Sequence, residues 1–143
     1  IGARGVGLAQ GAIDHASAFI KERSAFGQQV CDFQGVRWML ADMAIQTEAA
    51  RHLVYRAASL VDQSAPSAVL APVAAMAKCF ASDTAMKVAT DAVQLFGAAG
   101  VSSEYPINRY FRDAKVLQII EGTNQIQRNI VANSLLGRVS RSN

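Results

Sequence analysis

Cysteine is scarce in this sequence, which contains only Cys31 and Cys79 among its 143 residues. Two cysteines without CxxC spacing form neither a disulfide framework nor a redox motif, so both are expected to be reduced thiols. The two histidines, His15 and His52, lie far apart and have no pair of carboxylates at ligand spacing. No metal site is therefore expected.

Long runs of one kind of residue are also missing. The 14 basic and 11 acidic residues give a net charge of +3, and the basic residues are scattered along the chain. A nucleic-acid-binding surface needs a basic stripe with interleaved aromatic residues, so no nucleic-acid partner is expected. No uncharged apolar run reaches the roughly 18 residues of a membrane span. The start, "IGARGVGLAQ", lacks the basic region and the cleavage site of a signal peptide.

Alternation with period two, which is typical of strands, is absent over any useful length. Helical spacing is present instead, and the clearest apolar stripe consists of Val6, Ala9, Ile13, Ala16 and Ile20. Helices are expected at about 3–24, 33–62, 69–96 and 106–119, followed by a helix that Thr123 caps. The length of 143 residues and the 51% hydrophobic content fit one domain, 1–143. The expected fold is all-α, an up-down helical bundle of three long helices plus a shorter pair.

The connections between these helices contain the residues that interrupt helices. Gly27 interrupts "SAFGQQVCD", and Pro66 precedes the third long helix. Pro72 is compatible with that helix only in its first turn. Gly97 is expected to end it, after which "GAAGVSSEYP" would be a loop. Because that helix has small residues on one face and larger ones on another, we expect neighbours on both sides.

Glu121 is the one residue whose position raises a chemical question. In "IIEGTNQIQR" it follows two β-branched apolar residues and stands at the expected break between the last two helices. A surface glutamate at a helix end is the simpler interpretation. Alternatively, the upstream "VLQII" would desolvate the carboxylate and raise its pKa, as a base for a weakly acidic C–H requires. The residues alone favour the surface glutamate and leave both interpretations open.

Three stretches together resemble the C-terminal domain of the acyl-CoA dehydrogenases: "RGVGLAQGAIDHASAFIKERSAFGQQVCDFQGVRWMLADMA", "ATDAVQLFGAAGVSSEYPINRYFRDAK" and "QIIEGTNQIQRNIVA". They cover almost the whole chain in order. The resemblance implies an FAD-dependent oxidoreductase of fatty acid metabolism that converts an acyl-CoA thioester to a trans-2-enoyl-CoA. In it, Glu121 matches the base that removes the α-proton while the β-hydrogen passes to the flavin as hydride. Gly122 matches a position whose backbone lies against the substrate.

The resemblance also implies which residues bind FAD. Thr123, Asn124 and Gln125 match a segment that touches the cofactor. Arg23, with Phe26 near it, matches the arginine that reaches the flavin diphosphate, and Gln34 matches a second contact. The "QLFGA" segment matches the family's "QLFGG" stretch at the adenosine end; its residues are Gln94, Leu95, Phe96, Gly97 and Ala98. In the family, Arg23, Gln34 and the 94–98 segment usually serve the FAD of the neighbouring subunit, so a homodimer or homotetramer is implied.

The sequence departs from the family in two respects. Ala98 replaces the second glycine, and its methyl group would crowd a close approach of the backbone to the cofactor. The N-terminal helical domain and the middle β-domain of the family are missing, so the chain is expected to be a fragment with little activity alone. An arginine near the CoA-side pocket would precede Ile1. Glutamate at 121 argues against relatives with the base on the first helix and against nitroalkane-oxidising relatives, which have Asp there.

Several alternatives stay open on the sequence. An acyl-CoA oxidase would share these motifs, and the chain alone could act as a non-catalytic helical oligomerisation or interaction module. The implied partners are an acyl-CoA substrate and an electron-accepting flavoprotein. The expected location is the cytoplasm of a bacterium, with the mitochondrial matrix as the alternative.

Overall fold

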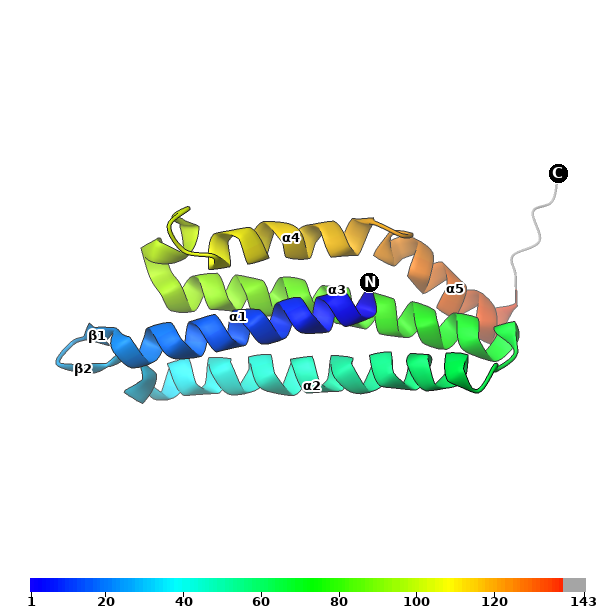
Figure 1. The fold of residues 1–143 in the computed structure, drawn as a ribbon, viewed down its shortest axis with the longest axis horizontal. Helices are drawn as coiled ribbons and strands as arrows, with labels where there is room; N and C mark the ends of the chain where they lie inside the picture. Colours follow the sequence, from blue (N-terminus) through cyan, green and yellow to red (C-terminus); the bar gives the residue numbers. More distant parts are fainter. Residues whose placement is uncertain (138–143) are drawn as a thin grey trace.

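The structure is a computed structural model that describes residues 1–137 and is an elongated helical bundle (Figure 1). Its five α-helices are α1 (Gly2–Glu22), α2 (Gln34–Asp62), α3 (Ser67–Phe96), α4 (Ile107–Ile119) and α5 (Asn124–Leu136). Two short 3-10 helices, η1 (Val30–Asp32) and η2 (Gly97–Val101), precede α2 and follow α3. The all-α bundle of three long and two shorter helices is therefore confirmed, and the boundaries agree with the expected ones to within two residues.

Helix α3 is the centre of the bundle. It contacts α1, α2, α4 and α5, with α2 on one side in Figure 1 and α4 and α5 on the other. The small residues of α1 and α3 allow their backbones to approach closely. The approach is tightest at Gly5 of α1, where an added β-carbon would lie only 2.8 Å from the carbonyl oxygen of Ala81. The expectation that α3 has neighbours on both sides is confirmed. The stretch Ser67–Val101 is long and apolar enough to cross a membrane, but its apolarity is that of a core helix, which meets the same criterion.

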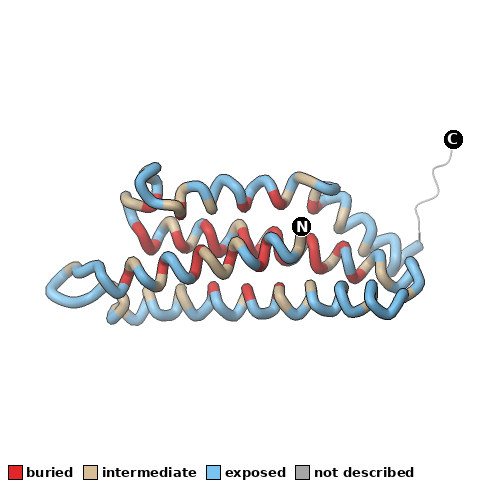
Figure 2. Tube along the Cα trace, viewed as in Figure 1, coloured by how far each residue is buried: buried red, intermediate tan, exposed pale blue. Residues whose placement is uncertain are grey.

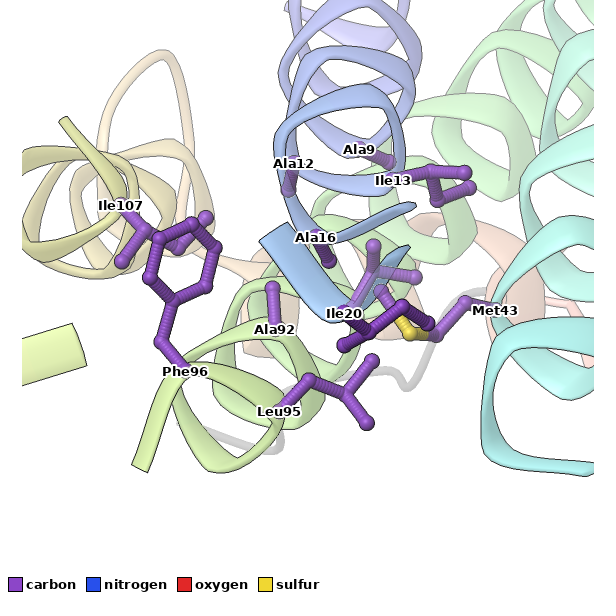
Figure 3. Packing of buried hydrophobic residues seen from close by; sticks show 11 residues of the cluster. Ala9, Ala12, Ile13, Ala16, Ile20, Met43, Ala92, Leu95, Phe96 and Ile107 are labelled. Carbon is purple, nitrogen blue, oxygen red and sulfur yellow. The ribbon is translucent and has the colours of Figure 1, made fainter. Parts of the chain in front are cut away.

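The main core lies where the C-terminal halves of α1 and α3 meet α2 and α4. Figure 3 shows Ile20 of α1, Met43 of α2 and Leu95 of α3 directed toward one another, with Phe96 beside Ile107 of α4. All five expected stripe residues of α1 are buried. The helical spacing also predicts an apolar stripe on α2, which consists of Val36, Leu40, Met43, Thr47, Ala50, Val54, Ala57 and Val61. This stripe is buried only in its middle, and Val61 at its end is 59% exposed. Figure 2 accordingly shows most of α2 exposed.

Three local expectations need correction. Helix α3 begins at Ser67, earlier than expected, so Pro72 lies inside the helix beyond its first turn. Gly97 does end α3, with φ +60, but the residues after it form η2 and not only a loop. Two two-residue strands, β1 (Ser24–Ala25) and β2 (Gln28–Gln29), form a hairpin where no strand was expected. Such short strands cannot show an alternating pattern in sequence.

Candidate functional site

The residues singled out from the sequence fall into two groups that lie apart in the fold. One group surrounds the β1–β2 hairpin and the C-terminal end of α3, and the other forms the turn between α4 and α5 (Figure 1). A helix rises roughly 1.5 Å per residue, so the part of α3 from Asp83, beside the turn, to Gln94 is about 17 Å long. The structure therefore brings the residues together within each group but not the two groups with each other.

The hairpin exposes the first group at one end of the bundle. Arg23 ends α1 in an extended conformation, and its carbonyl accepts a hydrogen bond from the amide of Val30 at 2.8 Å. Phe26 and Gly27 form the two-residue loop with φ of +53° and +81°, the left-handed conformation of a tight hairpin turn. The side chain of Phe26 is 97% exposed. Arg23 is exposed too, and it takes part in none of the ion pairs found within residues 1–137.

The 94–98 segment divides into core residues and exposed residues. Leu95 and Phe96 are buried, and the ring of Phe96 stacks on that of Phe19 with centroids 4.1 Å apart. The side chains of these two residues therefore pack the core, so a cofactor contact implied at these positions would involve their main chain. Gln94, Gly97 and Ala98 are exposed. A β-carbon added to Gly97 would meet nothing within 4 Å, so a ligand can approach its backbone.

Gln34, the first residue of α2, is exposed at the mouth of a cleft between α1 and α2. The cleft has a volume of about 730 Å³, and its other lining residues include Ile20, Cys31, Trp38 and Leu40. Gln34 therefore lies near the hairpin, as a second contact beside Arg23 would require.

Glu121 lies in the turn between α4 and α5, as expected. Its backbone is left-handed, with φ +52°, and Gly122 follows with φ +87°. Such a φ is uncommon for a residue with a side chain, and strain of this kind occurs where the surroundings impose it. Glu121 itself is exposed, as is Ile119 upstream, so the favoured interpretation of a surface glutamate holds for this chain alone and the alternative, desolvation by "VLQII", does not. The apolar residues of α4 face the core or solvent instead of covering the carboxylate.

Asn124 anchors the C-terminal side of this turn on α3. It is 3% exposed, and its Nδ2 donates to Oδ1 of Asp83 at 2.7 Å and to Oγ of Ser82 at 2.8 Å. Its Oδ1 accepts from Nζ of Lys78 at 2.7 Å. Lys78 is only 8% exposed and also donates to the carbonyl of Gln118, in the last turn of α4, at 3.4 Å. One buried ammonium group thus joins both sides of the turn.

Asp83 completes the connection to α4 and α5. Its carboxylate accepts from Nε2 of Gln118 at 2.7 Å and from Nη2 of Arg128 at 2.6 Å. Burial alone would raise the pKa of Asp83, but the hydrogen bonds from Arg128, Gln118 and Asn124 outweigh it and hold the pKa below its ordinary value. Burial lowers the pKa of Lys78, and the nearby charges of Asp83 and Glu121 are among the effects that oppose this shift.

The turn is also held by its own residues. Oγ1 of Thr123 accepts a hydrogen bond from the amide of Ile126 at 3.3 Å, which confirms the expected cap of α5. Nε2 of Gln127 donates to the carbonyls of Glu121 and Gly122 at 3.2 and 3.3 Å. Beside them lies a cleft of about 440 Å³ whose walls include Thr123, Gln125 and Arg128.

Sequence reasoning missed Lys78, Asp83, Gln118 and Gln127. A lysine, a serine and an aspartate at 78, 82 and 83 share one side of the alanine-rich α3, and that unusual polarity was the available signal. Their partners are 40 or more residues away in several cases, so the spacing alone could not identify them.

Comparison with known proteins agrees with the all-α fold. Residues 1–136 match the family described as acyl-CoA dehydrogenase, C-terminal domain. The chain therefore belongs to the acyl-CoA dehydrogenase family. It is 54% identical over 136 residues to the probable acyl-CoA dehydrogenase FadE25 of Mycobacterium tuberculosis, covering 95% of this chain and 34% of that protein.

Solved structures show the same domain. Butyryl-CoA dehydrogenase from Megasphaera elsdenii is 46% identical with a TM-score of 0.91, over 94% of this chain and 34% of the other. The FAD complex of PigA is 30% identical with a TM-score of 0.88, over 96% and 35% respectively. The chain thus spans about a third of the length of the relatives it matches.

Proposed function

We propose that this chain is the base-bearing domain of an FAD-dependent acyl-CoA dehydrogenase and that Glu121 removes the α-proton of an acyl-CoA thioester. The observation that carries the proposal is the exposed carboxylate of Glu121 on a left-handed turn held from both sides by buried hydrogen bonds. A base must meet its proton within hydrogen-bond distance, so an exposed carboxylate on a fixed turn suits this role.

The reaction removes two hydrogens from neighbouring carbons and leaves a trans-2-enoyl-CoA. The bound flavin supplies the hydride acceptor for the β-hydrogen. Glu121 takes the α-proton, and the left-handed turn lets the main chain of Gly122 approach the substrate without a β-carbon. A further part of the same proposal is an electron-accepting flavoprotein as the partner that reoxidises the enzyme.

The residues present fit an FAD at two places. Arg23 is exposed and outside the ion pairs of residues 1–137, so its guanidinium can pair with a diphosphate in two parallel hydrogen bonds. Gly97 has open space beside it, where the adenosine end can approach. Thr123 and Gln125 line a cleft together with Asp83 and Arg128. That the solved relative PigA is an FAD complex supports the same cofactor here.

The separation of the two groups of residues supports an assembly in which each FAD is shared. Arg23 and Gly97 lie at the hairpin end, and Glu121 lies beyond the roughly 17 Å of α3 that separate them. Residues at one end would therefore serve the cofactor of a neighbouring subunit, while Glu121 serves the substrate of its own. The exposed Phe26 at the hairpin tip fits such a contact.

The proposal also requires that something else covers Glu121, because a base for a weakly acidic C–H works best away from water. Exposed apolar side chains surround the turn: Val116 is 47% exposed, Ile119 54% and Ile126 51%. These side chains offer a surface for the acyl chain, the flavin or another domain. The desolvation expected from the sequence would then arise on assembly.

The test is Glu121→Gln in the complete enzyme, meaning a protein with this chain and the further domains of its relatives. FAD content should equal that of the wild type, and mixing with butyryl-CoA should no longer bleach the flavin. Glu104→Gln, at another exposed glutamate, is the matched control and should bleach normally. Normal bleaching in Glu121→Gln would remove the proposed role of this residue.

A second candidate function is a helical interaction module, which exposed apolar residues on α2 favour. Trp38 is 62% exposed, Ile45 63% and Tyr55 62%. Exposed apolar side chains of this size mark an interaction surface where they are contiguous. If the 143-residue chain alone purified with bound FAD and reduced a dye with butyryl-CoA, a purely non-catalytic module would be ruled out.

A further inference from the structure

The backbone of Glu121 is held in an unfavourable conformation by hydrogen bonds from other residues of the chain. The left-handed conformation is sterically unfavourable for a residue with a side chain, and Gly122 continues the left-handed path. The turn therefore needs restraints from outside, and the structure shows three of them, one before Glu121, one after it and one on its own carbonyl.

The first two restraints meet at Lys78. Its Nζ donates to the carbonyl of Gln118 before the turn and to Oδ1 of Asn124 after it. Asn124 in turn donates hydrogen bonds to Ser82 and Asp83. Lys78 therefore links the end of α4 and the start of α5 within one hydrogen-bond network. No buried side-chain nitrogen or oxygen of residues 1–137 lacks a partner, so this polar cluster is complete.

The third restraint is the side chain of Gln127. It donates to the carbonyls of both left-handed residues, Glu121 and Gly122. A β-carbon added to Gly122 would lie 2.7 Å from Nε2 of Gln127, so the amide sits directly against the turn. Unlike Lys78, Gln127 is partly exposed and packs no core.

We propose that Lys78, Asn124 and Gln127 are positioning residues that fix the carboxylate of Glu121 for removal of the α-proton. This inference rests on the proposed function of Glu121. Lys78 and Asn124 bond to residues that flank Glu121, and Gln127 bonds to the carbonyls of Glu121 and Gly122, so loss of these contacts should change the rate of proton removal more than the affinity for acyl-CoA. Misplacement of a reacting group by about 1 Å can cost roughly 100-fold in rate.

The test uses the complete FAD-bound enzyme and the rate constant of flavin reduction at saturating butyryl-CoA. Lys78→Met keeps the length of the side chain and removes its donor, and Gln127→Met does the same at a partly exposed position. Both should lower the rate constant by about 10- to 100-fold, while the Kd for butyryl-CoA and the FAD content stay within about twofold. Lys87→Met is the matched control, since Lys87 is an exposed residue of α3 that pairs with Asp91. Its rate constant should be that of the wild type.

A rescue variant separates positioning from general support of the fold. Gln127→Lys restores a donor that can reach the same carbonyls and should recover most of the rate lost in Gln127→Met. The inference would be overturned if Gln127→Lys reduced its flavin as slowly as Gln127→Met. It would also be overturned if the variants lost FAD but kept the wild-type rate constant of flavin reduction per bound flavin. If Lys78→Met does not fold, the Gln127 pair decides the question alone.

The same experiment distinguishes this inference from the proposed function. If Glu121→Gln still reduces its flavin at the wild-type rate, the proposed base is wrong. If Glu121→Gln is inactive but Lys78→Met and Gln127→Met react like the wild type, Glu121 remains the proposed base and only the proposed positioning role of Lys78 and Gln127 is wrong.

Discussion

Nζ of Lys78 donates to Oδ1 of Asn124 at 2.7 Å although the two residues are 46 positions apart. This contact lies inside the bundle, beneath the turn that carries Glu121. It joins the central helix α3 to the first residue of α5 and makes the position of the turn depend on α3.

Asn124→Ala should destabilise the chain by about 1–3 kcal/mol, because Lys78 and Asp83 would each lose a buried partner. The matched control is Asn129→Ala, at an exposed position of α5, which should change the free energy of unfolding by less than about 0.5 kcal/mol. Urea unfolding followed by circular dichroism measures both. Equal stability of the two variants would contradict the buried network.

Gly5→Ala and Gly7→Ala should have opposite effects, though both place alanine in α1. At Gly5 the added methyl would lie 2.8 Å from the carbonyl oxygen of Ala81, and overpacking of this kind costs about 1–3 kcal/mol. At Gly7 nothing lies within 4 Å, and alanine favours helix by about 1 kcal/mol. Thermal unfolding should therefore give a lower Tm for the first variant and a higher one for the second.

Glu121→Gly should be more stable than Glu121→Ala by about 1 kcal/mol, because only glycine adopts the left-handed conformation without strain. Both variants remove the carboxylate, so the difference between them reports on the backbone alone. Urea unfolding of the two chains measures it. An alanine variant as stable as the glycine variant would mean that the turn is not left-handed in solution.

Stability should fall in acid partly through Asp83. Its pKa in the folded chain lies below the ordinary value of 3.8, so the ionised carboxylate stabilises the fold above about pH 3.8. That contribution is lost as the pH falls through the lower, folded value. Asp83→Asn should be less stable than the wild type at neutral pH but lose less of its stability between pH 3.8 and more acidic conditions. Parallel acid profiles for the two proteins would show that Asp83 contributes nothing.

Arg23→Gln in the complete enzyme should lower the FAD content after purification, because the guanidinium is proposed to pair with the diphosphate. It should leave the thermal stability of this chain unchanged, since Arg23 is exposed and takes no part in the ion pairs of residues 1–137. Arg56→Gln, at an exposed position of α2, is the control and should keep its FAD. Equal FAD content in both variants would remove Arg23 from the proposed site.

Local features of the fold could be predicted from sequence because they depend on neighbours in the chain. The stripe of α1, from Val6 to Ile20, follows the helical period, and Thr123 caps α5 with its own side chain. Gly97 ends α3 because glycine tolerates its φ of +60°. The position of Glu121 between two helices followed from the same signals.

Features that depend on residues distant in sequence could not be predicted. Lys78 is buried because α4 and α5 fold over it, and nothing in "AAMAKCF" indicates that Asn124 will be its partner. Whether Glu121 is desolvated could not be decided from sequence for the reverse reason: adjacent apolar residues do not cover a carboxylate when the turn leaves it exposed. Leu95 and Phe96 stand in a motif that resembles a cofactor-binding segment, yet the core of this bundle takes both side chains.

Helix α3 both packs against α1 and holds the turn that carries Glu121, and residues on the same turns of the helix serve both purposes. Its alanines leave no room between Ala81 and Gly5, while Lys78, Ser82 and Asp83 on the same turns of the helix hold the turn that carries Glu121. A larger side chain on α3 would push the helix outward and displace the proposed base with it. Helix α2 makes no hydrogen bond to that turn within residues 1–137 and buries only Met43, Thr47 and Ala50, so substitutions on its exposed face should leave the turn in place.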